Sequence, residues 1–139
     1  MNKNLEVLEE LTRKLTPFSK IIKKETADYV ELESKDGSII GFSLFKDARV
    51  LVSRFLMTDG ASFAKHVHDG IHEFLLIIEG KLDLVFDDRT VTMVEKDHVM
   101  IPPCVPHAGI AHGTTWVLCV SMPPEPMFVT GDIKVLRKS

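Results

Sequence analysis

Short apolar runs separated by turn-forming residue pairs fill the chain from Tyr29 onward, and this pattern most constrains the fold. Pairs such as Asp59-Gly60, Asp69-Gly70 and Glu79-Gly80 are typical of turns between strands. Strands that recur at roughly 8–12 residues, with almost no helical pattern among them, predict an all-β sandwich or barrel. The predicted strands are Tyr29–Glu33, Ser38–Phe45, Val50–Met57, Ser62–His68, Glu73–Ile78, Lys81–Phe86, Thr90–Val94, Val99–Ile101, Val105–Ala111, Thr115–Ser121 and Phe128–Leu136.

Three of these strands carry a further expectation. In Lys81–Phe86, Leu82 and Leu84 alternate with polar residues, so one face of the strand is expected to lie in the core. Phe74–Ile78 is apolar throughout, and its outer face needs cover from an N-terminal helix or a second subunit. Phe128–Leu136 follows a proline-rich connector and is expected at a sheet edge.

The front of the chain has the only helical pattern. Residues 1–28 are predicted to form a short N-terminal α-helix and a linker, and residues 29–139 the β-barrel domain. Leucines at three- and four-residue steps give the helix one apolar stripe, and Thr16-Pro17 ends it. A lid over a sheet face is favoured over a partner-binding or DNA-binding helix, because helix-turn-helix recognition needs more helices. The stripe consists of Leu5, Leu8, Leu11 and Leu15.

Length, charge and cysteine content exclude several classes of protein. A chain of 139 residues fits one compact domain, and a net charge of −3 gives no footprint for nucleic acid or an anionic membrane. The longest apolar run is far shorter than the roughly 20 residues of a membrane-spanning helix. The charged N-terminus lacks the apolar core of a signal peptide. Two cysteines are too few for a disulfide framework, so a cytoplasmic protein is expected.

A cluster of histidines with one glutamate points to a metal site. His66 and His68 are two residues apart, so a strand would place both imidazoles on the same face. Glu73 opens the next strand after a tight turn, and His107 follows a stiff proline-rich loop. Three imidazoles and one carboxylate suit transition metals rather than calcium or magnesium.

The spacing of these residues resembles the first sequence motif of the cupin superfamily. Five residues separate Gly60 from His66-x-His68, four residues follow before Glu73, and six more precede Gly80. The second motif is matched in part: its proline and histidine are present, whereas its two glycines and its asparagine are replaced. These positions are Asp97, Pro102, Cys104, His107 and Ala111.

The resemblance covers about Val50 to Ser121 and implies a double-stranded β-helix, or jelly-roll barrel. It also implies that His66, His68, Glu73 and His107 are the metal ligands of one divalent transition metal ion, Fe, Mn, Ni or Zn. Four protein ligands would leave two open positions on an octahedral ion, where a substrate, water or dioxygen can bind. Glu73 is in addition the candidate catalytic residue, through its effect on the charge of the ion.

Other residues have weaker claims to the site. Strand parity places His72 on the face opposite Glu73, and His98 and His112 are expected at the solvated rim. Cys104 is expected to be a free buried thiol, with an approach to the pocket as the alternative. Arg54 is expected on the strand surface; the alternative is that it reaches into the barrel and binds a substrate carboxylate.

The expected function is that of a metal-binding cupin, a dioxygenase-like enzyme acting on a small organic molecule in the barrel pocket. The alternative is a non-catalytic cupin that binds or senses a small ligand, since no catalytic residue outside the metal shell is recognisable. A homodimer is expected, because a chain of 15.6 kDa has limited capacity to cover both faces of a sheet.

Overall fold

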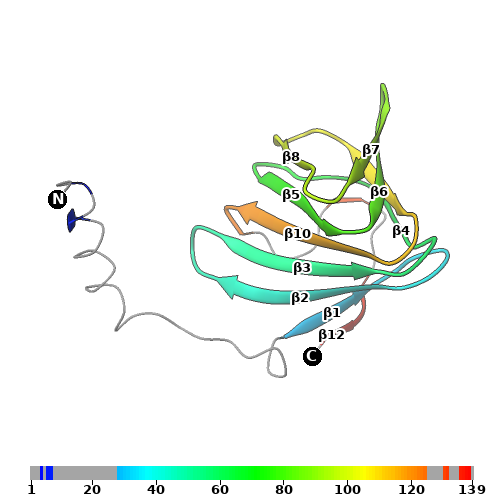
Figure 1. Cartoon of the computed structure of the whole chain (residues 1–139), viewed down its shortest axis with the longest axis horizontal. Helices are drawn as coiled ribbons and strands as arrows, with labels where there is room; N and C mark the ends of the chain where they lie inside the picture. Colours follow the sequence, from blue (N-terminus) through cyan, green and yellow to red (C-terminus); the bar gives the residue numbers. More distant parts are fainter. Residues whose placement is uncertain (1–3, 5, 8–27, 125–129, 132–134, 139) are drawn as a thin grey trace.

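The computed structural model describes residues 4, 6, 7, 28–124, 130, 131 and 135–138. Its strands form two antiparallel sheets (Figure 1). The large sheet has seven strands in the order β12-β1-β2-β3-β10-β5-β8, and the small sheet has five in the order β11-β4-β9-β6-β7. The strands of the large sheet are β1 Tyr29–Leu32, β2 Ile39–Lys46, β3 Leu51–Met57, β5 His72–Glu79, β8 His98–Ile101, β10 Thr115–Met122 and β12 Val135–Lys138. Those of the small sheet are β4 Ser62–Val67, β6 Lys81–Phe86, β7 Thr90–Val94, β9 His107–Ala111 and β11 Thr130–Gly131.

The core lies between the sheets and is built from the inward residues of alternating strands. Leu75 and Ile77 of β5 face Leu82 and Leu84 of β6, and all four side chains are buried. The predicted one-sided burial of the strand Lys81–Phe86 is therefore confirmed. The turn spacing predicted an all-β sandwich or barrel, and the two antiparallel sheets confirm it.

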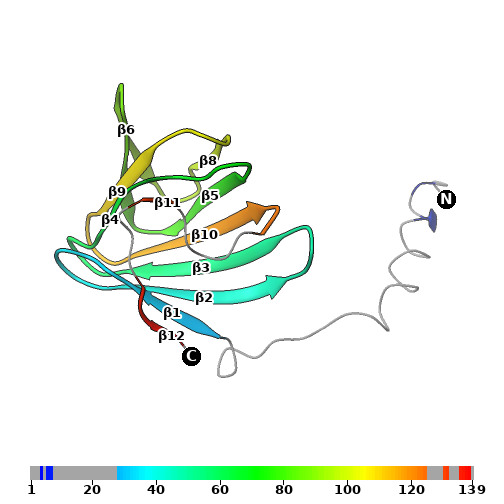
Figure 2. The same ribbon diagram turned by 180° about the vertical axis from the view of Figure 1, so that it is seen from behind.

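The predicted last strand, Phe128–Leu136, is wrong as a single element. Thr130–Gly131 pairs with β4 of the small sheet, whereas Val135–Lys138 pairs with β1 of the large sheet. The described residues of the span predicted as one strand therefore belong to two sheets, with β12 beside β1 (Figure 2), and residues 128, 129 and 132–134 lie outside the described part of the chain. Both segments are edge strands, as expected, but a period-two pattern does not show which sheet a strand joins.

The helix predicted within residues 1–28 lies outside the described residues, apart from Asn4, Glu6 and Val7. Within the described part of the chain, no helix has the length and apolar character needed to cross a membrane.

The outward face of the large sheet is largely apolar. On β5 the outward residues Phe74, Leu76 and Ile78 are half-buried or exposed, which confirms that this strand is apolar on both faces. The neighbouring strands continue the surface, which we call the outer apolar face: Ile40, Phe42, Val52, Leu56, Phe74, Leu76, Ile78, Trp116, Leu118 and Val120. Arg54 lies within it, its guanidinium carbon 5.2 Å from the Phe42 ring centroid and 4.9 Å from that of Trp116.

Two turn glycines of the first motif, Gly60 and Gly80, occupy different surroundings. Both have positive φ, +79° and +97°, which strains a residue with a side chain. A Cβ at Gly80 would lie 2.5 Å from the Thr114 carbonyl oxygen, whereas at Gly60 the nearest atom would be 3.7 Å away. Only Gly80 is therefore required by packing as well as by backbone conformation.

We expect Gly80→Ala to lower the free energy of unfolding by about 3 kcal/mol, and Gly60→Ala by only about 1 kcal/mol. Both variants carry the cost of positive φ, but only the first forces backbone atoms apart. Denaturant titration of the two variants beside the wild type measures the difference. Equal losses would show that conformation alone selects glycine at position 80.

Candidate metal centre

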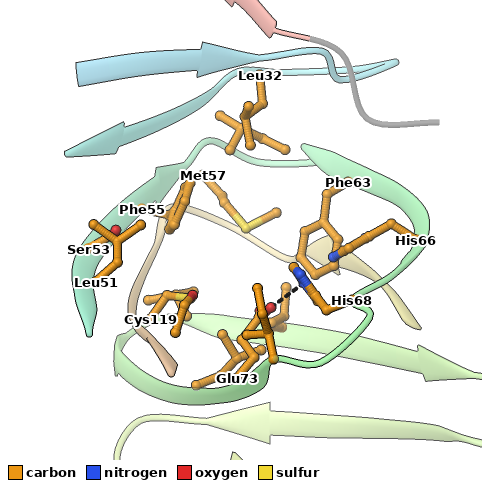
Figure 3. Close-up of a pocket in the computed structure, with 16 residues that line it drawn as sticks. Leu32, Leu51, Ser53, Phe55, Met57, Phe63, His66, His68, Glu73 and Cys119 are labelled. Atoms are coloured by element: carbon orange, nitrogen blue, oxygen red, sulfur yellow. Dashed lines mark hydrogen bonds and ion pairs between the residues drawn. The ribbon is translucent and has the colours of Figure 1, made fainter. Parts of the chain in front are cut away.

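A cavity of about 100 Å³ lies between the two sheets, and His66, His68 and Glu73 of the histidine–glutamate cluster line part of it (Figure 3). Most of its wall is apolar and comes from both sheets, including Phe55 and Met57 of β3 and Leu82 of β6. His66 and His68 point toward Glu73 across the cavity.

Three segments bring the cluster together. His66 on β4 is the register partner of His107 on β9, and their ring centroids are 4.2 Å apart. His68 follows β4, and Glu73 comes from β5 in the opposite sheet. One ligand atom from each of these four residues lies within 4.8 Å of the others, so the structure places the four candidate ligands around one point.

Backbone carbonyls orient two of the rings. His66 Nδ1 lies 2.9 Å from the Ala64 oxygen, and His107 Nδ1 lies 2.9 Å from the Val105 oxygen. A carbonyl only accepts a hydrogen bond, so each Nδ1 carries the proton and donates it. The neutral form of each ring then has its lone pair on Nε2. Such outer hydrogen bonds fix ring orientation in metal-ligating histidines.

Glu73 is buried beside these rings and stays ionised. Its Oε2 contacts His68 Nε2, and its Oε1 lies 3.9 Å from His107 Nε2. Burial alone would raise the pKa of this carboxyl, but the interactions with His107 and His68 outweigh it and hold the pKa well below its ordinary value. The cluster therefore contains a permanent negative charge at neutral pH.

The pKa values of the two oriented histidines, His66 and His107, are shifted in opposite directions. Burial lowers the pKa of His66 to about 4. Burial also acts to lower the pKa of His107, but the neighbouring Glu73 carboxylate and the Val105 carbonyl favour the protonated ring, and the net pKa lies above its ordinary value. His66 is therefore neutral near pH 7, whereas protons compete with a metal ion for His107.

The residues present fit a transition metal ion. Nδ1 of His68 is buried and has no hydrogen-bond partner, and Nε2 of His68 and of His107 have only the Glu73 carboxylate beside them. Buried polar atoms are normally paired, and a cation bound through one nitrogen of each ring would give those nitrogens a partner. Nitrogen donors with one carboxylate are the donor set of first-row transition metals.

A family model described as "Cupin domain" matches residues 53–122, which includes all four candidate ligands. The chain belongs to the cupin family. Quercetin 2,3-dioxygenase of Bacillus subtilis (strain 168) is 37% identical to this cupin over 49 residues, 35% of this chain. The match spans only 14% of that enzyme's length.

Solved structures of other proteins share the fold. A cupin superfamily protein of Desulfitobacterium hafniense DCB-2 has a TM-score of 0.60 and 26% identity, over 66% of this chain and 84% of that one. The polyketide cyclase RemF of Streptomyces resistomycificus has a TM-score of 0.66 and 21% identity, over 81% and 84% of the two chains. One architecture thus carries proteins of different activity, so function has to be argued from the site.

The other histidines lie outside the cluster. His72 is exposed although its neighbour Glu73 is buried, as strand parity predicts. His98 is exposed on β8, and Nε2 of His112 lies 2.7 Å from Asp83 Oδ2 on the outside of the small sheet. Arg54 does not line the cavity; it lies on the strand surface, and the alternative of a barrel-facing arginine is wrong.

The expectation for Cys104 is also wrong. Its side chain is exposed, neither buried nor lining the cavity, and its sulfur lies 3.8 Å from Asp69 Oδ1. Cys104 takes a φ of +65°, the conformation for which glycine is favoured at this position of the motif. Its amide donates to the His68 carbonyl at 2.8 Å, which fixes the loop and turns the side chain outward.

Sequence reasoning missed three polar residues of the cavity, Ser53, Cys119 and Ser121. Cys119 is buried, and its pKa is raised well above the ordinary value by burial and by the Glu73 charge, so it is a thiol. Ser121 stands opposite Glu73 in the register of β10 with β5. The alternation along β10 could have identified two of them from the sequence. Inward-facing positions on this strand follow the parity of buried Thr115, and they are Val117, Cys119 and Ser121.

We expect replacement of both His66 and His68 by Ala to abolish stoichiometric metal binding, because two of the four donors disappear. His72→Ala with His98→Ala is the matched control, since both side chains are exposed and outside the cluster. Elemental analysis of protein purified without a chelating tag gives the metal content. A full equivalent retained by the first double variant would contradict the ligand assignment.

We expect His66 in the metal-free protein to stay neutral down to about pH 5, with its proton on Nδ1, and His107 to remain partly protonated near pH 7. Metal affinity should then fall as pH falls, because protons displace the ion from His107. Long-range ¹H–¹⁵N NMR of the rings reads tautomer and charge directly. A His66 that titrates between pH 6 and 7 would contradict the effect of burial.

Proposed function

We propose that this cupin is a metal-dependent, dioxygenase-like enzyme that acts on a small organic molecule in the cavity between its sheets. One divalent transition metal ion, Fe, Mn, Ni or Zn, would be held by His66, His68, Glu73 and His107. The observation that carries the proposal is that three imidazoles and one buried carboxylate converge beside an apolar cavity. A purely structural cluster would have no need of an adjoining space for a ligand.

When bound, the metal ion would supply open coordination positions for Lewis-acid or redox chemistry. The chain's own residues define the setting for that chemistry. His66 and His107 present fixed Nε2 atoms, Glu73 keeps a negative charge beside them, and the apolar wall excludes water from the reacting end of a substrate. The likeness to a quercetin dioxygenase supports an oxygenase over other metal chemistry, although it covers only a short stretch.

Non-catalytic binding of a small ligand is the second candidate function. Outside the cluster, the described residues that line the cavity carry no Asp, Glu, His or Lys for acid–base work. A site that only holds a ligand through the ion needs none. The behaviour of the Glu73 carboxylate distinguishes the two functions, since it tunes a reaction more than it holds an ion.

We expect Glu73→Gln to retain much of the metal but to lose at least about tenfold in turnover, because the amide is neutral and cannot accept a proton. Oxygen uptake by iron-loaded protein with catechols, flavonols, thiols and small keto acids measures turnover. Glu79→Gln is the matched control on the same strand, where the carboxylate is exposed and outside the cavity.

No oxygen uptake by the wild type with any of these compounds, together with measurable ligand binding, would contradict the enzyme proposal and support the binding protein. Full turnover by metal-loaded Glu73→Gln would contradict a catalytic role for this residue. Metal content is measured on every sample, so that loss of the ion is not mistaken for loss of catalysis.

We further propose a cytoplasmic homodimer that binds neither nucleic acid nor membrane. The outer apolar face supports pairing, because it spreads over β2, β3, β10 and β5 and Ile78 within it is 42% exposed. The net charge of −3 gives no attraction to polyanions, and both cysteines are free, as expected in a reducing compartment. The division of the chain at residue 28 stays a prediction.

We expect light scattering at micromolar concentration to give about twice the chain mass of 15.6 kDa. Leu76→Lys should shift the mass toward one chain, because it places two cations in a paired apolar interface. Val91→Lys, on the small sheet where Val91 is already 39% exposed, is the control and should leave the mass unchanged. A monomeric wild type would show that the face is covered within one chain.

A further inference from the structure

The cavity wall carries no cationic side chain among the residues that the structure describes. Beyond the cluster itself, its polar atoms come from Ser53, Cys119 and Ser121, none of which is an Asp, Glu, Lys or Arg. Every other lining side chain is aliphatic, aromatic or a thioether. A ligand therefore meets charge only at its cluster-facing end.

The charge at that end is small. With three neutral imidazoles and one carboxylate as ligands, a divalent ion would have a net charge of about +1. One deprotonated donor group on the ligand neutralises it. A second anionic group would lie in the apolar wall without a partner, and the burial of an unpaired charge is costly.

The cavity is also small. Its volume of about 100 Å³ is below the roughly 150 Å³ of an engineered apolar cavity that holds benzene. The space therefore holds at most one ring or a short branched chain, and any larger part of a ligand would lie at the mouth. Phe55, Met57 and Phe63 limit its width (Figure 3).

We propose that the cavity selects a compact, uncharged and largely apolar molecule that presents one ionisable donor group to the cluster. It discriminates against phosphates, sugar acids and dicarboxylates, whose further charges find no partner in the wall. The part of this inference that concerns the donor group rests on the proposed metal function. The preference for an apolar ligand body rests only on the residues of the cavity wall.

Calorimetric binding to zinc-loaded protein tests the selection without any turnover. Catechol and 3,4-dihydroxybenzoate share the same chelating end and differ by one carboxylate. We expect the acid to bind at least about tenfold more weakly, and oxalate and the three-ring flavonol quercetin also to bind more weakly than catechol. Equal or tighter binding of the acid, or no binding of catechol at millimolar concentration, would overturn the charge selection. Tighter binding of quercetin would overturn the size selection.

A cation placed in the wall should change the preference. Ser53→Lys puts an ammonium group in the cavity and should reduce the catechol-to-acid ratio by about tenfold. Thr90→Lys adds the same charge on exposed β7 and should leave the ratio unchanged. An unchanged ratio in folded Ser53→Lys contradicts the proposal, and if that variant does not fold, the wild-type ratio decides alone.

The outcomes separate this inference from the proposed reaction. Selective catechol binding with no oxygen uptake by iron-loaded protein would contradict the oxygenase and leave the selection standing. Oxygen uptake with both the neutral and the anionic compound, bound with equal affinity, would support the oxygenase and contradict the selection.

Discussion

The structure depends on a contact between its two sheets at the Glu73 carboxylate. The carboxylate belongs to the large sheet, whereas His66 and His107 belong to the small sheet. Each partner is buried, so none of these polar groups has access to enough water to compensate for a lost neighbour. The position of the sheets relative to each other and the geometry of the candidate site are thus determined together.

This arrangement explains how an otherwise apolar interior tolerates four ionisable side chains. Carbonyls of Ala64 and Val105 take up the Nδ1 protons of two rings, and the remaining nitrogens converge on the carboxylate. Among these four side chains, the nitrogens without a hydrogen bond are both of His68 and Nε2 of His107. Burial of these nitrogens without hydrogen bonds costs folding free energy, and it also leaves them available to bind a cation.

Local pattern and spacing predicted most of the fold and the members of the cluster. Turn pairs marked the strands, and the period of two placed Glu73 inside and His72 outside. Pairing between distant segments could not be read in this way. The division of Phe128–Leu136 between two sheets and the cavity-lining positions of Ser53 and Cys119 depend on which strands are neighbours. The exposure of Cys104 depends on its own left-handed backbone conformation and on one backbone hydrogen bond. A hydrophobic pattern predicts neither of these.

That hydrogen bond ties the proline-rich loop to the backbone of a candidate ligand. The Cys104 amide holds the His68 carbonyl, and the same loop leads into β9 at His107. A change in the backbone of this loop would therefore be transmitted to two candidate ligands, His68 and His107. A bulkier or β-branched residue at position 104, where φ is positive, would shift both imidazoles without touching either ring. Divergence at this surface position is thus a route by which related chains can retune the centre while keeping every ligand.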